Sequence, residues 1–234
     1  MNKIAVYAGT RNVYPQMVTA AKSLLCHTRM DAVHFLIEDD TFPEQLPDVI
    51  RCSNVSSQGW FRKDGPNYRS RWTYMTLMRL AIPDIFQDEE RVLWLDVDTI
   101  VTDDISQLFH EDLEQCYFGM IPEVPDRSKP PFTYYNAGVM LINVLRFQAD
   151  GRQYYHDLID LVNLQRMDFP DQDAINLLCQ TRIKALAPCW NSGRWTKELP
   201  ADEANIVHFM ADRQYTERAL YKQYAQMDWR VSNG

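Results

Sequence analysis

Short apolar runs alternate along this chain with segments of helical periodicity, and this alternation constrains the fold more than any other feature. Apolar runs of strand length lie at residues 3–8, 32–38, 92–98, 138–144 and 204–210. Apolar residues recur at helical spacing in segments 14–25, 154–164 and 173–179. Strands that alternate with helices predict an α/β fold with a mostly parallel central sheet flanked by helices. The runs are apolar throughout, as in strands covered on both faces.

Length and composition predict a single domain. The chain has 234 residues, of which 46% belong to the AVILMFWYC set, enough for a sizeable core. Neither a repeat nor a break in composition divides residues 1–234. The one polar, basic interruption is segment 53–72, whose cations are Arg62, Lys63, Arg69 and Arg71. We interpret it either as an exposed loop or as a mobile basic lid beside an anionic ligand.

Charge and cysteine content narrow the function classes. The net charge of −8 disfavours a broad nucleic-acid interface, which is normally basic, and fits a protein that handles a small ligand or a metal. The five cysteines form no CxxC pair and predict reduced thiols. The first apolar run is too short for a signal peptide, and none approaches the ~18 residues of a membrane span. We therefore expect a cytoplasmic protein with no membrane span.

Two aspartates, Asp96 and Asp98, follow the apolar run of "VLWLDVD". Residues two apart on a strand point to the same face, and the carboxyl end of a strand opens into the crevice where α/β sheets bind ligands. Two carboxylates on one side suit Mg²⁺ or Mn²⁺. The alternative is turn and capping chemistry, which we assign to the next pair, Asp103 and Asp104, directly before "ISQLF".

A third metal ligand is available at His208, which ends the apolar run "NIVHF". Imidazole is a good ligand for first-row metals, and a strand end is a suitable place for one. The alternative is a buried histidine satisfied by the core.

Several other polar groups lie at predicted element boundaries. Asn136, Ala137 and Gly138 precede a strand and offer amide groups and close backbone approach, or form a simple turn. Asp171, Gln172 and Asp173 begin a predicted helix, where acids are favoured for capping alone but would also hydrogen-bond a hydroxyl-rich ligand.

"VYAGTRNVY" (6–14) joins a strand to a helix and suits nucleotide contacts through backbone groups. Arg79 lies alone on an amphipathic helix and is free to pair with an acid or a phosphate.

Taken together and in order, these segments resemble glycosyltransferase family 8. The pieces are "VYAGTRNVYPQMVTAAKSLL", "TLMRLAIPDIF", "VLWLDVDTIVTDDISQLF", "YYNAGVMLIN", "DQDAINLLC" and "NIVHF", within about residues 4 to 215. The resemblance implies a GT-A fold, a UDP-sugar donor with Mn²⁺ or Mg²⁺, and transfer with retention of anomeric configuration. UDP-glucose or UDP-galactose is the expected donor, and a saccharide hydroxyl the expected acceptor.

The resemblance also implies roles for individual residues. Asp96 and Asp98 match the DxD metal motif, and His208 matches the third ligand. The residues matched to donor contacts are Ala8, Thr10, Tyr14, Arg79, Asn136, Ala137, Asp171 and Gln172, with Glu123 as an acid near the sugar. If a double displacement operates, Gln172, Asp171 and Asp173 are the candidate groups below the ring. Because an amide is a poor nucleophile, we favour front-face attack with Gln172 stabilising charge.

The segment after His208 departs from the family pattern. The family continues His-x-x-Gly-x-x-Lys, whereas here Ala211 and Gln214 stand at the glycine and lysine positions. Arg213, or a cation of segment 53–72, is the candidate replacement for the lysine that steadies the donor diphosphate.

The sequence leaves three alternative functions open. They are a glycosyltransferase that acts on protein or modified DNA, a nucleotide-sugar binder without activity, and an α/β domain in which the aspartates only cap. The sugar, the acceptor and the oligomeric state are not encoded in any motif. Trp190, Arg194 and Trp195 in "CWNSGRW" are candidates for stacking on a sugar ring or for core and rim packing.

Overall fold

The structure is a computed structural model that describes residues 1–125 and 131–229. Within these residues, a central sheet has the strand order β3-β2-β1-β4-β7-β6-β8. Its strands are β1 (Ile4–Ala8), β2 (Ala32–Ile37), β3 (Ile50–Asn54), β4 (Arg91–Leu95), β6 (Phe118–Pro122), β7 (Tyr135–Asn143) and β8 (Ile183–Ala185). Strands β3, β2, β1 and β4 pair in parallel, as do β6 and β8, whereas β7 runs antiparallel to both neighbours. The predicted mostly parallel sheet is confirmed.

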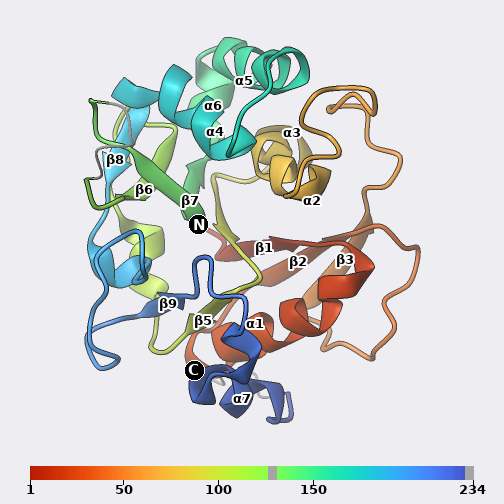
Figure 1. The fold of residues 1–234 in the computed structure, drawn as a ribbon, viewed down its shortest axis with the longest axis vertical. Coiled ribbons are helices and arrows are strands. Elements are labelled where there is room, and N and C mark those ends of the chain that lie inside the picture. Colours follow the sequence, from red (N-terminus) through yellow and green to blue (C-terminus); the bar gives the residue numbers. More distant parts are fainter. Residues whose placement is uncertain (126–130, 230–234) are drawn as a thin grey trace.

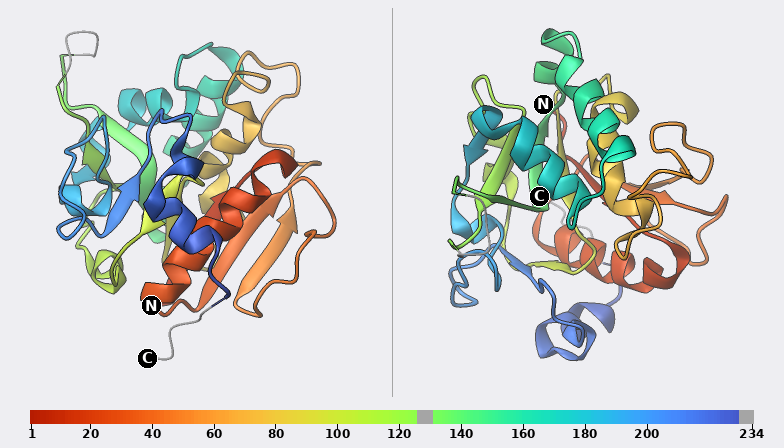
Figure 2. Two further views of the ribbon diagram at one scale, coloured as in Figure 1. Left: turned by 60° about the horizontal axis from the view of Figure 1, so that its bottom comes forward. Right: turned by 45° about the horizontal axis from the view of Figure 1, so that its top comes forward.

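Helices cover both faces of this sheet. They are α1 (Tyr14–His27), α2 (Thr73–Leu77), α3 (Ile82–Ile85), α4 (Val144–Ala149), α5 (Gln153–Leu164), α6 (Pro170–Leu178) and α7 (Ala219–Ala225). Short 3₁₀ turns are η1 (Arg11–Val13), η2 (Met78–Ala81), η3 (Ser106–His110), η4 (Gln180–Arg182), η5 (Pro188–Trp190) and η6 (Tyr215–Glu217). Helices α2 to α6 lie on one side and α1 with α7 on the other (Figure 1), and α1 and α7 pack side by side (Figure 2).

The continuous apolar runs are explained by this two-sided cover. In β4, Val92 and Trp94 pack into the core under α2–α6, while Leu93 and Leu95 pack into the core under α1. Successive residues of a strand point to opposite faces. When both faces are covered by helices, every position of the strand is buried and is therefore apolar.

A second, two-stranded ribbon brings the late part of the chain to the end of β4. It consists of β5 (Thr99–Val101) and β9 (Ile206–His208), which are antiparallel, with Thr99 opposite His208. The ribbon therefore places His208 next to the two aspartates that precede β5, although more than a hundred positions separate them in the sequence.

Several predicted boundaries are corrected. The strand expected at 92–98 ends at Leu95, and the following turn closes with the Thr99 amide donating to the Asp96 carbonyl (3.2 Å). The strand expected at 138–144 already begins at Tyr135, and the helix expected at 173–179 already begins at Pro170. The strand expected at 204–210 is reduced to Ile206–His208.

The polar segment 53–72 begins inside β3, which the sequence did not reveal, and is irregular beyond Asn54. Its middle is anchored to the end of α5: the buried Asn67 side chain donates to the carbonyls of Val162 and Gln165, both at 2.7 Å. Among the described residues, no helix is long and apolar enough to cross a membrane.

Candidate active site

A pocket opens where β4 and the ribbon end, beside the first turn of α6. It encloses about 510 Å³ of empty space, counted with its open mouth. Its polar lining includes Arg79, Asp96, Asp98, Asn136, Asp171, Gln172 and His208, and its apolar lining includes Trp72, Phe169, Trp195 and Met210. The pocket thus collects most of the sequence-predicted site residues in one place.

Asp96 is held by two donors on one oxygen. The indole Nε1 of Trp94 (2.9 Å) and Nη2 of Arg79 (2.8 Å) both donate to Asp96 Oδ1. The second oxygen, Oδ2, lies 4.0 Å from His208 Nε2. Burial raises the pKa of Asp96, and the nearby charges of Arg79 and His208 offset this only in part. One oxygen is therefore fixed by the protein, while the other faces the neighbouring imidazole.

Asp98 and His208 face each other directly. Asp98 Oδ1 lies 3.1 Å from His208 Nε2, and one ligand atom from each of Asp96, Asp98 and His208 fall within 4.8 Å of one another. Burial opposes ionisation of Asp98, but the adjacent imidazole outweighs it, so the pKa of Asp98 is lowered. Burial likewise lowers the pKa of His208, and the Asp98 carboxylate reverses this to a net increase. Two carboxylates and an imidazole form a donor set that fits Mn²⁺ or Mg²⁺.

Glycines seat the imidazole ring. A Cβ on Gly138 would lie 2.0 Å from His208 Cε1, and a Cβ on Gly193 would lie 2.4 Å from the His208 carbonyl oxygen. The ring therefore rests against the bare backbone of β7, and Gly138 is the part of the "Asn-Ala-Gly" segment that permits this close approach.

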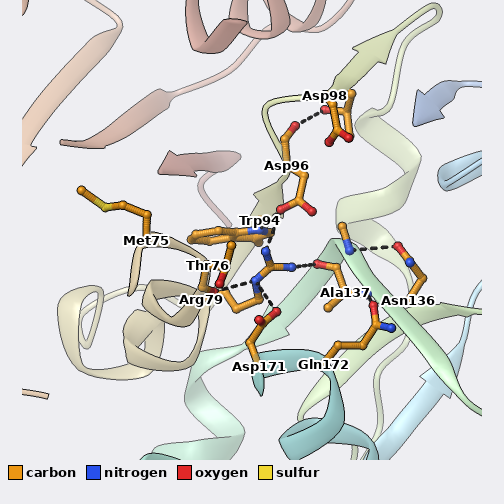
Figure 3. Close-up of polar contacts among 12 residues, drawn as sticks. Met75, Thr76, Arg79, Trp94, Asp96, Asp98, Asn136, Ala137, Asp171 and Gln172 are labelled. Atoms are coloured by element: carbon orange, nitrogen blue, oxygen red, sulfur yellow. Dashed lines mark hydrogen bonds and ion pairs between the residues drawn. The ribbon is translucent and has the colours of Figure 1, made fainter. Parts of the chain in front are cut away.

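Arg79 lies at the centre of the polar wall, between Asp96 and Asp171 and against the ring of Trp94 (Figure 3). Its Nε contacts Asp171 Oδ2 at 3.0 Å and the Thr76 carbonyl at 2.9 Å. Its Nη1 donates to the Ala137 carbonyl. The side chain is only 4% exposed, so the guanidinium is largely used in joining the two carboxylates.

Three neighbouring polar residues in the first turn of α6, Asp171, Gln172 and Asp173, make different contacts. Asp171 lines the pocket, and its burial raises the pKa of the carboxyl, against the opposing charge of Arg79. Gln172 also lines the pocket, and its Oε1 accepts from the Ala137 amide (2.8 Å).

Asp173 does not line the pocket. Its two oxygens accept from the Tyr134 hydroxyl and, at 2.9 Å, from the Phe169 amide. Asp173 thus stabilises the start of α6, as a helix N-terminus favours, and our candidate placement of it below a sugar ring is not supported by this geometry. Asp104 likewise caps: its Oδ1 accepts from the Ser106 amide (2.9 Å) in front of η3.

Asn136, Ala137 and Glu123 form the floor behind the pocket. Asn136 and Ala137 belong to β7 itself rather than to a turn before it. Glu123 Oε1 accepts from Asn136 Nδ2 (2.9 Å) and from Gln172 Nε2 (3.2 Å). Glu123 is buried and does not line the pocket, so it supports residues that do.

An aromatic wall faces the polar one. Trp72, Phe169 and Trp195 come from three separate loops, and neighbouring ring centroids lie 5.7 Å (Trp72–Phe169) and 6.0 Å (Phe169–Trp195) apart. The guanidinium of Arg71 covers Trp72 at 4.7 Å. All three aromatics are half-buried. Of the "CWNSGRW" candidates, only Trp195 reaches this pocket; Trp190 packs in the core, and Arg194 lines a neighbouring cavity.

The segment predicted to hold uridine lies outside this lining. Tyr14 is 1% exposed, and its hydroxyl donates to Asp39 (2.9 Å) and accepts from the Glu38 amide (3.1 Å). These bonds hold Tyr14 at the start of α1, and its contact with uridine stays a prediction. Ala8 and Thr10, at the end of β1, are half-buried.

The departure after His208 has a structural signature. Ala211 lines the pocket with φ of +58°, the left-handed conformation that favours glycine. Arg213 is exposed two positions later and does not line the pocket. Gln214, at the position of the family's lysine, is exposed as well.

Four residues of the site were not predicted from the sequence: Trp72, Trp94, Phe169 and Asn191. Asn191 Oδ1 lies 2.9 Å from His208 Nδ1. Tryptophan at position 94 reads as ordinary core, and no local pattern indicates that its N–H reaches Asp96. A signal was present only for Phe169, which immediately precedes the polar helix start.

Comparison with known proteins decides the family. The family model described as Glycosyl transferase family 8 matches residues 4–213. The chain belongs to glycosyl transferase family 8. This membership confirms the resemblance drawn from the motifs and supports a glycosyl transfer function.

The curated relatives are longer proteins. The glycosyltransferase GlyE of Streptococcus pneumoniae serotype 4 (strain ATCC BAA-334 / TIGR4) is 26% identical over 98% of this chain, which spans 62% of GlyE. GlyA of the same organism is 25% identical over 97% of this chain, which spans 34% of GlyA.

Solved glycosyltransferase structures share the fold. The crystal structure of GlyE aligns over 98% of this chain and 61% of its own, with a TM-score of 0.72 and 23% identity. The galactosyltransferase LgtC, solved in complex with donor and acceptor sugar analogs, aligns over 98% of both chains, with a TM-score of 0.70 and 18% identity. The fold is the GT-A fold.

Proposed function

We propose that residues 1–234 form a single GT-A unit that transfers a hexose from UDP-glucose or UDP-galactose to a saccharide hydroxyl, with retention of anomeric configuration. The observation that carries the proposal is the pocket itself. Its polar wall combines a three-ligand cation site with the Arg79–Asp171 pair and the Gln172 amide, and its other wall is aromatic.

Asp96, Asp98 and His208 would hold Mn²⁺ or Mg²⁺. A divalent cation there would neutralise charge on the departing diphosphate. The chain's own contribution is orientation, because Asp96 is already fixed by Trp94 and Arg79 before any ligand arrives. Preorganised groups need not reorganise when charge develops.

The donor sugar would lie against Asp171 and Gln172. Sugar hydroxyls pair with carboxylate and amide groups, and the Arg79 ion pair keeps the Asp171 carboxylate oriented. The reacting carbon develops oxocarbenium character as its bond to the diphosphate breaks. The Gln172 amide dipole would stabilise that charge, whereas an amide is a poor nucleophile, so we favour front-face attack by the acceptor hydroxyl.

The acceptor would approach over Trp72, Phe169 and Trp195. Aromatic rings bury the apolar face of a sugar while the hydroxyls around it remain available for hydrogen bonds. The half-buried rings that line the pocket support a saccharide acceptor over a polypeptide or a DNA duplex, whose phosphates would meet a chain of net charge −8. The five free cysteines support the proposed cytoplasmic location.

A donor screen tests the proposal. UDP release is measured with Mn²⁺ across common UDP-sugars, with simple saccharides as acceptors, and the anomeric configuration of the product is read by NMR. We expect UDP-glucose or UDP-galactose to give the highest turnover and a retained anomer. Absence of UDP release from every donor, with UDP and Mn²⁺ still bound, would indicate a nucleotide-sugar binder instead. An inverted product would contradict the front-face mechanism.

A further inference from the structure

A chain of buried amides leads from the backbone of β7 to the metal-site histidine. It starts at the amide of Gly138, which can only donate. This amide donates to Asn136 Oδ1 at 3.0 Å. The orientation of the Asn136 amide is thereby fixed, and its Nδ2 points the other way and donates to Glu123 Oε1 at 2.9 Å.

The next link is Asn191. The same Asn136 Oδ1 accepts a second hydrogen bond, from Asn191 Nδ2 at 2.9 Å. An oxygen that faces an acceptor would repel it, so the nitrogen of the Asn191 amide must face Asn136. The Asn191 oxygen consequently faces His208, with 2.9 Å between Oδ1 and Nδ1. An amide oxygen only accepts, and Nδ1 must therefore carry a proton.

We infer that Asn191, oriented by Asn136, is a positioning residue that keeps a proton on Nδ1 of His208, so that Nε2 is the nitrogen that binds a cation. A neutral imidazole has one donor nitrogen and one acceptor nitrogen. Nε2 is the nitrogen that faces Asp98 Oδ1 (3.1 Å) and Asp96 Oδ2 (4.0 Å). Without a cation, Nε2 faces carboxylate oxygens and carries a proton too; a cation held between the carboxylates would take the place of that proton. The inference rests on the proposed metal site only for the identity of what Nε2 binds.

Burial makes this arrangement specific. Asn191 is 0% exposed, Asn136 3% and His208 6%. Water cannot replace a mismatched partner at such positions, so a flipped amide would leave buried groups unsatisfied. Partners behind a ligating histidine commonly fix its tautomer and orientation, and their loss weakens metal binding about 10- to 100-fold.

The chain of amides continues to the sugar side of the pocket. Gln172 Oε1 accepts from the Ala137 amide (2.8 Å), and its Nε2 donates to the same Glu123 oxygen that Asn136 contacts. Consecutive amides of β7 therefore orient both ends: Gly138 orients the His208 branch, and Ala137 orients the Gln172 branch. A change at Asn191 should disturb only the first branch.

The tautomer can be read directly in the wild-type protein. Long-range ¹H–¹⁵N correlation NMR on ¹⁵N-histidine-labelled protein, with Zn²⁺ as a diamagnetic probe, distinguishes Nδ1 from Nε2. We expect a proton on Nδ1 and the metal-induced shift on Nε2 of His208. A proton on Nε2 of the Zn²⁺-bound ring, or a metal shift on Nδ1, would overturn the inference. If Zn²⁺ shifts no histidine, the proposed metal site fails, and a missing proton on Nδ1 of the metal-free protein would still overturn the role of Asn191.

A matched pair of variants tests the consequence for metal binding. Asn191→Leu keeps the branched shape of the side chain and removes both of its hydrogen bonds, and we expect Mn²⁺ affinity by calorimetry to fall about 10- to 100-fold. Asn191→Asp retains an acceptor for Nδ1–H and should keep more affinity than Asn191→Leu. The control is Asn67→Leu, at an asparagine that is 1% exposed and hydrogen-bonded to backbone outside the pocket.

The control should lower the melting temperature without changing Mn²⁺ affinity. A folded Asn191→Leu variant whose Mn²⁺ affinity stays within about twofold of wild type would overturn the inference, because loss of the partner behind a ligating histidine weakens metal binding at least about tenfold. An equal loss of affinity in Asn67→Leu would overturn it too, since the effect would then come from general destabilisation.

Discussion

The two walls of the pocket are built in opposite ways. On the polar wall, Asp96, Arg79 and His208 are fixed by hydrogen bonds that end on backbone groups or buried side chains. On the aromatic wall, Trp72 and Trp195 come from loops, and the contacts are ring against ring. The groups proposed for bond breaking are therefore fixed before a ligand binds, whereas the groups proposed for acceptor recognition can change with the loops that carry them.

The largest expected effect is on the polar wall, from Gly138→Ala. The new Cβ would meet His208 Cε1 at 2.0 Å, so the imidazole must leave its position between the aspartates. We expect Mn²⁺ affinity, measured by calorimetry, to fall by at least about 100-fold, the upper end of what an indirect change at a metal ligand causes.

The matched control for this prediction is Gly59→Ala, where an added Cβ meets nothing within 4 Å. It should leave Mn²⁺ affinity unchanged. If Gly138→Ala binds Mn²⁺ as wild type does, the polar wall is not the rigid unit described above.

A smaller and different effect is expected on the aromatic wall, from Trp195→Ala. Loss of one stacking ring removes about 1 kcal/mol of contact, which corresponds to a five- to tenfold higher KM for the saccharide acceptor. Slow hydrolysis of the donor without acceptor should not change. Steady-state kinetics with and without acceptor make the measurement.

The control is Trp229→Ala, since Trp229 packs near Lys22, away from the pocket. It should leave the acceptor KM unaltered. Equal losses of donor hydrolysis and transfer in Trp195→Ala would show that the two walls act as one.

A modest effect is expected from Arg213→Ala. This side chain is exposed two positions after Ala211, which lines the pocket, and exposed cations contribute little because solvent screens them. If it meets the donor diphosphate in place of the family's lysine, UDP affinity by calorimetry should fall about threefold, in line with a contribution below 1 kcal/mol. Arg218→Ala, at an arginine already paired with Asp212 (2.7 Å), is the control. An unchanged affinity would dismiss Arg213 from the site.

The smallest effect is expected from Ala211→Gly, in the turn after β9. A non-glycine residue with positive φ is strained, and glycine relieves the strain at some cost in unfolded-chain entropy. We expect a gain of about 0.5 kcal/mol in the free energy of unfolding, seen as a rise of about 1–2 °C in melting temperature. A lower melting temperature would mean that the turn does not adopt this conformation in solution.

Much of the fold was accessible from the sequence because it depends on local apolar pattern. The runs that became β1, β2 and β4 are buried on both faces, and burial of that kind leaves a readable signature. Strand β3 was missed because it lies at the sheet edge, where four of its five residues are exposed and polar or small. In an edge strand with a single buried residue, the sequence contains no alternation of apolar and polar residues from which the strand could be predicted.

Only those site residues whose side-chain chemistry is distinctive could be predicted from the sequence. The Asp96, Asp98 and His208 side chains were predicted because carboxylates and an imidazole at strand ends are unusual. The groups that support them were not predicted. Trp94 and Asn191 act through contacts with Asp96 and His208 that no sequence pattern indicates. Asp171 and Asp173 show the reverse limit: neighbouring acids at a helix start look alike in the sequence, and only the direction of each side chain separates the helix cap from the residue that lines the pocket.

The central claim is that the pocket binds a UDP-linked donor through a cation held by Asp96, Asp98 and His208. The most direct measurement is calorimetry of UDP binding with Mn²⁺ and with EDTA, for wild type and for Asp98→Asn. We predict that wild type binds UDP at least tenfold more tightly with Mn²⁺, and that the folded Asp98→Asn variant shows no such difference. UDP affinity in wild type that is the same with Mn²⁺ and with EDTA would contradict the account.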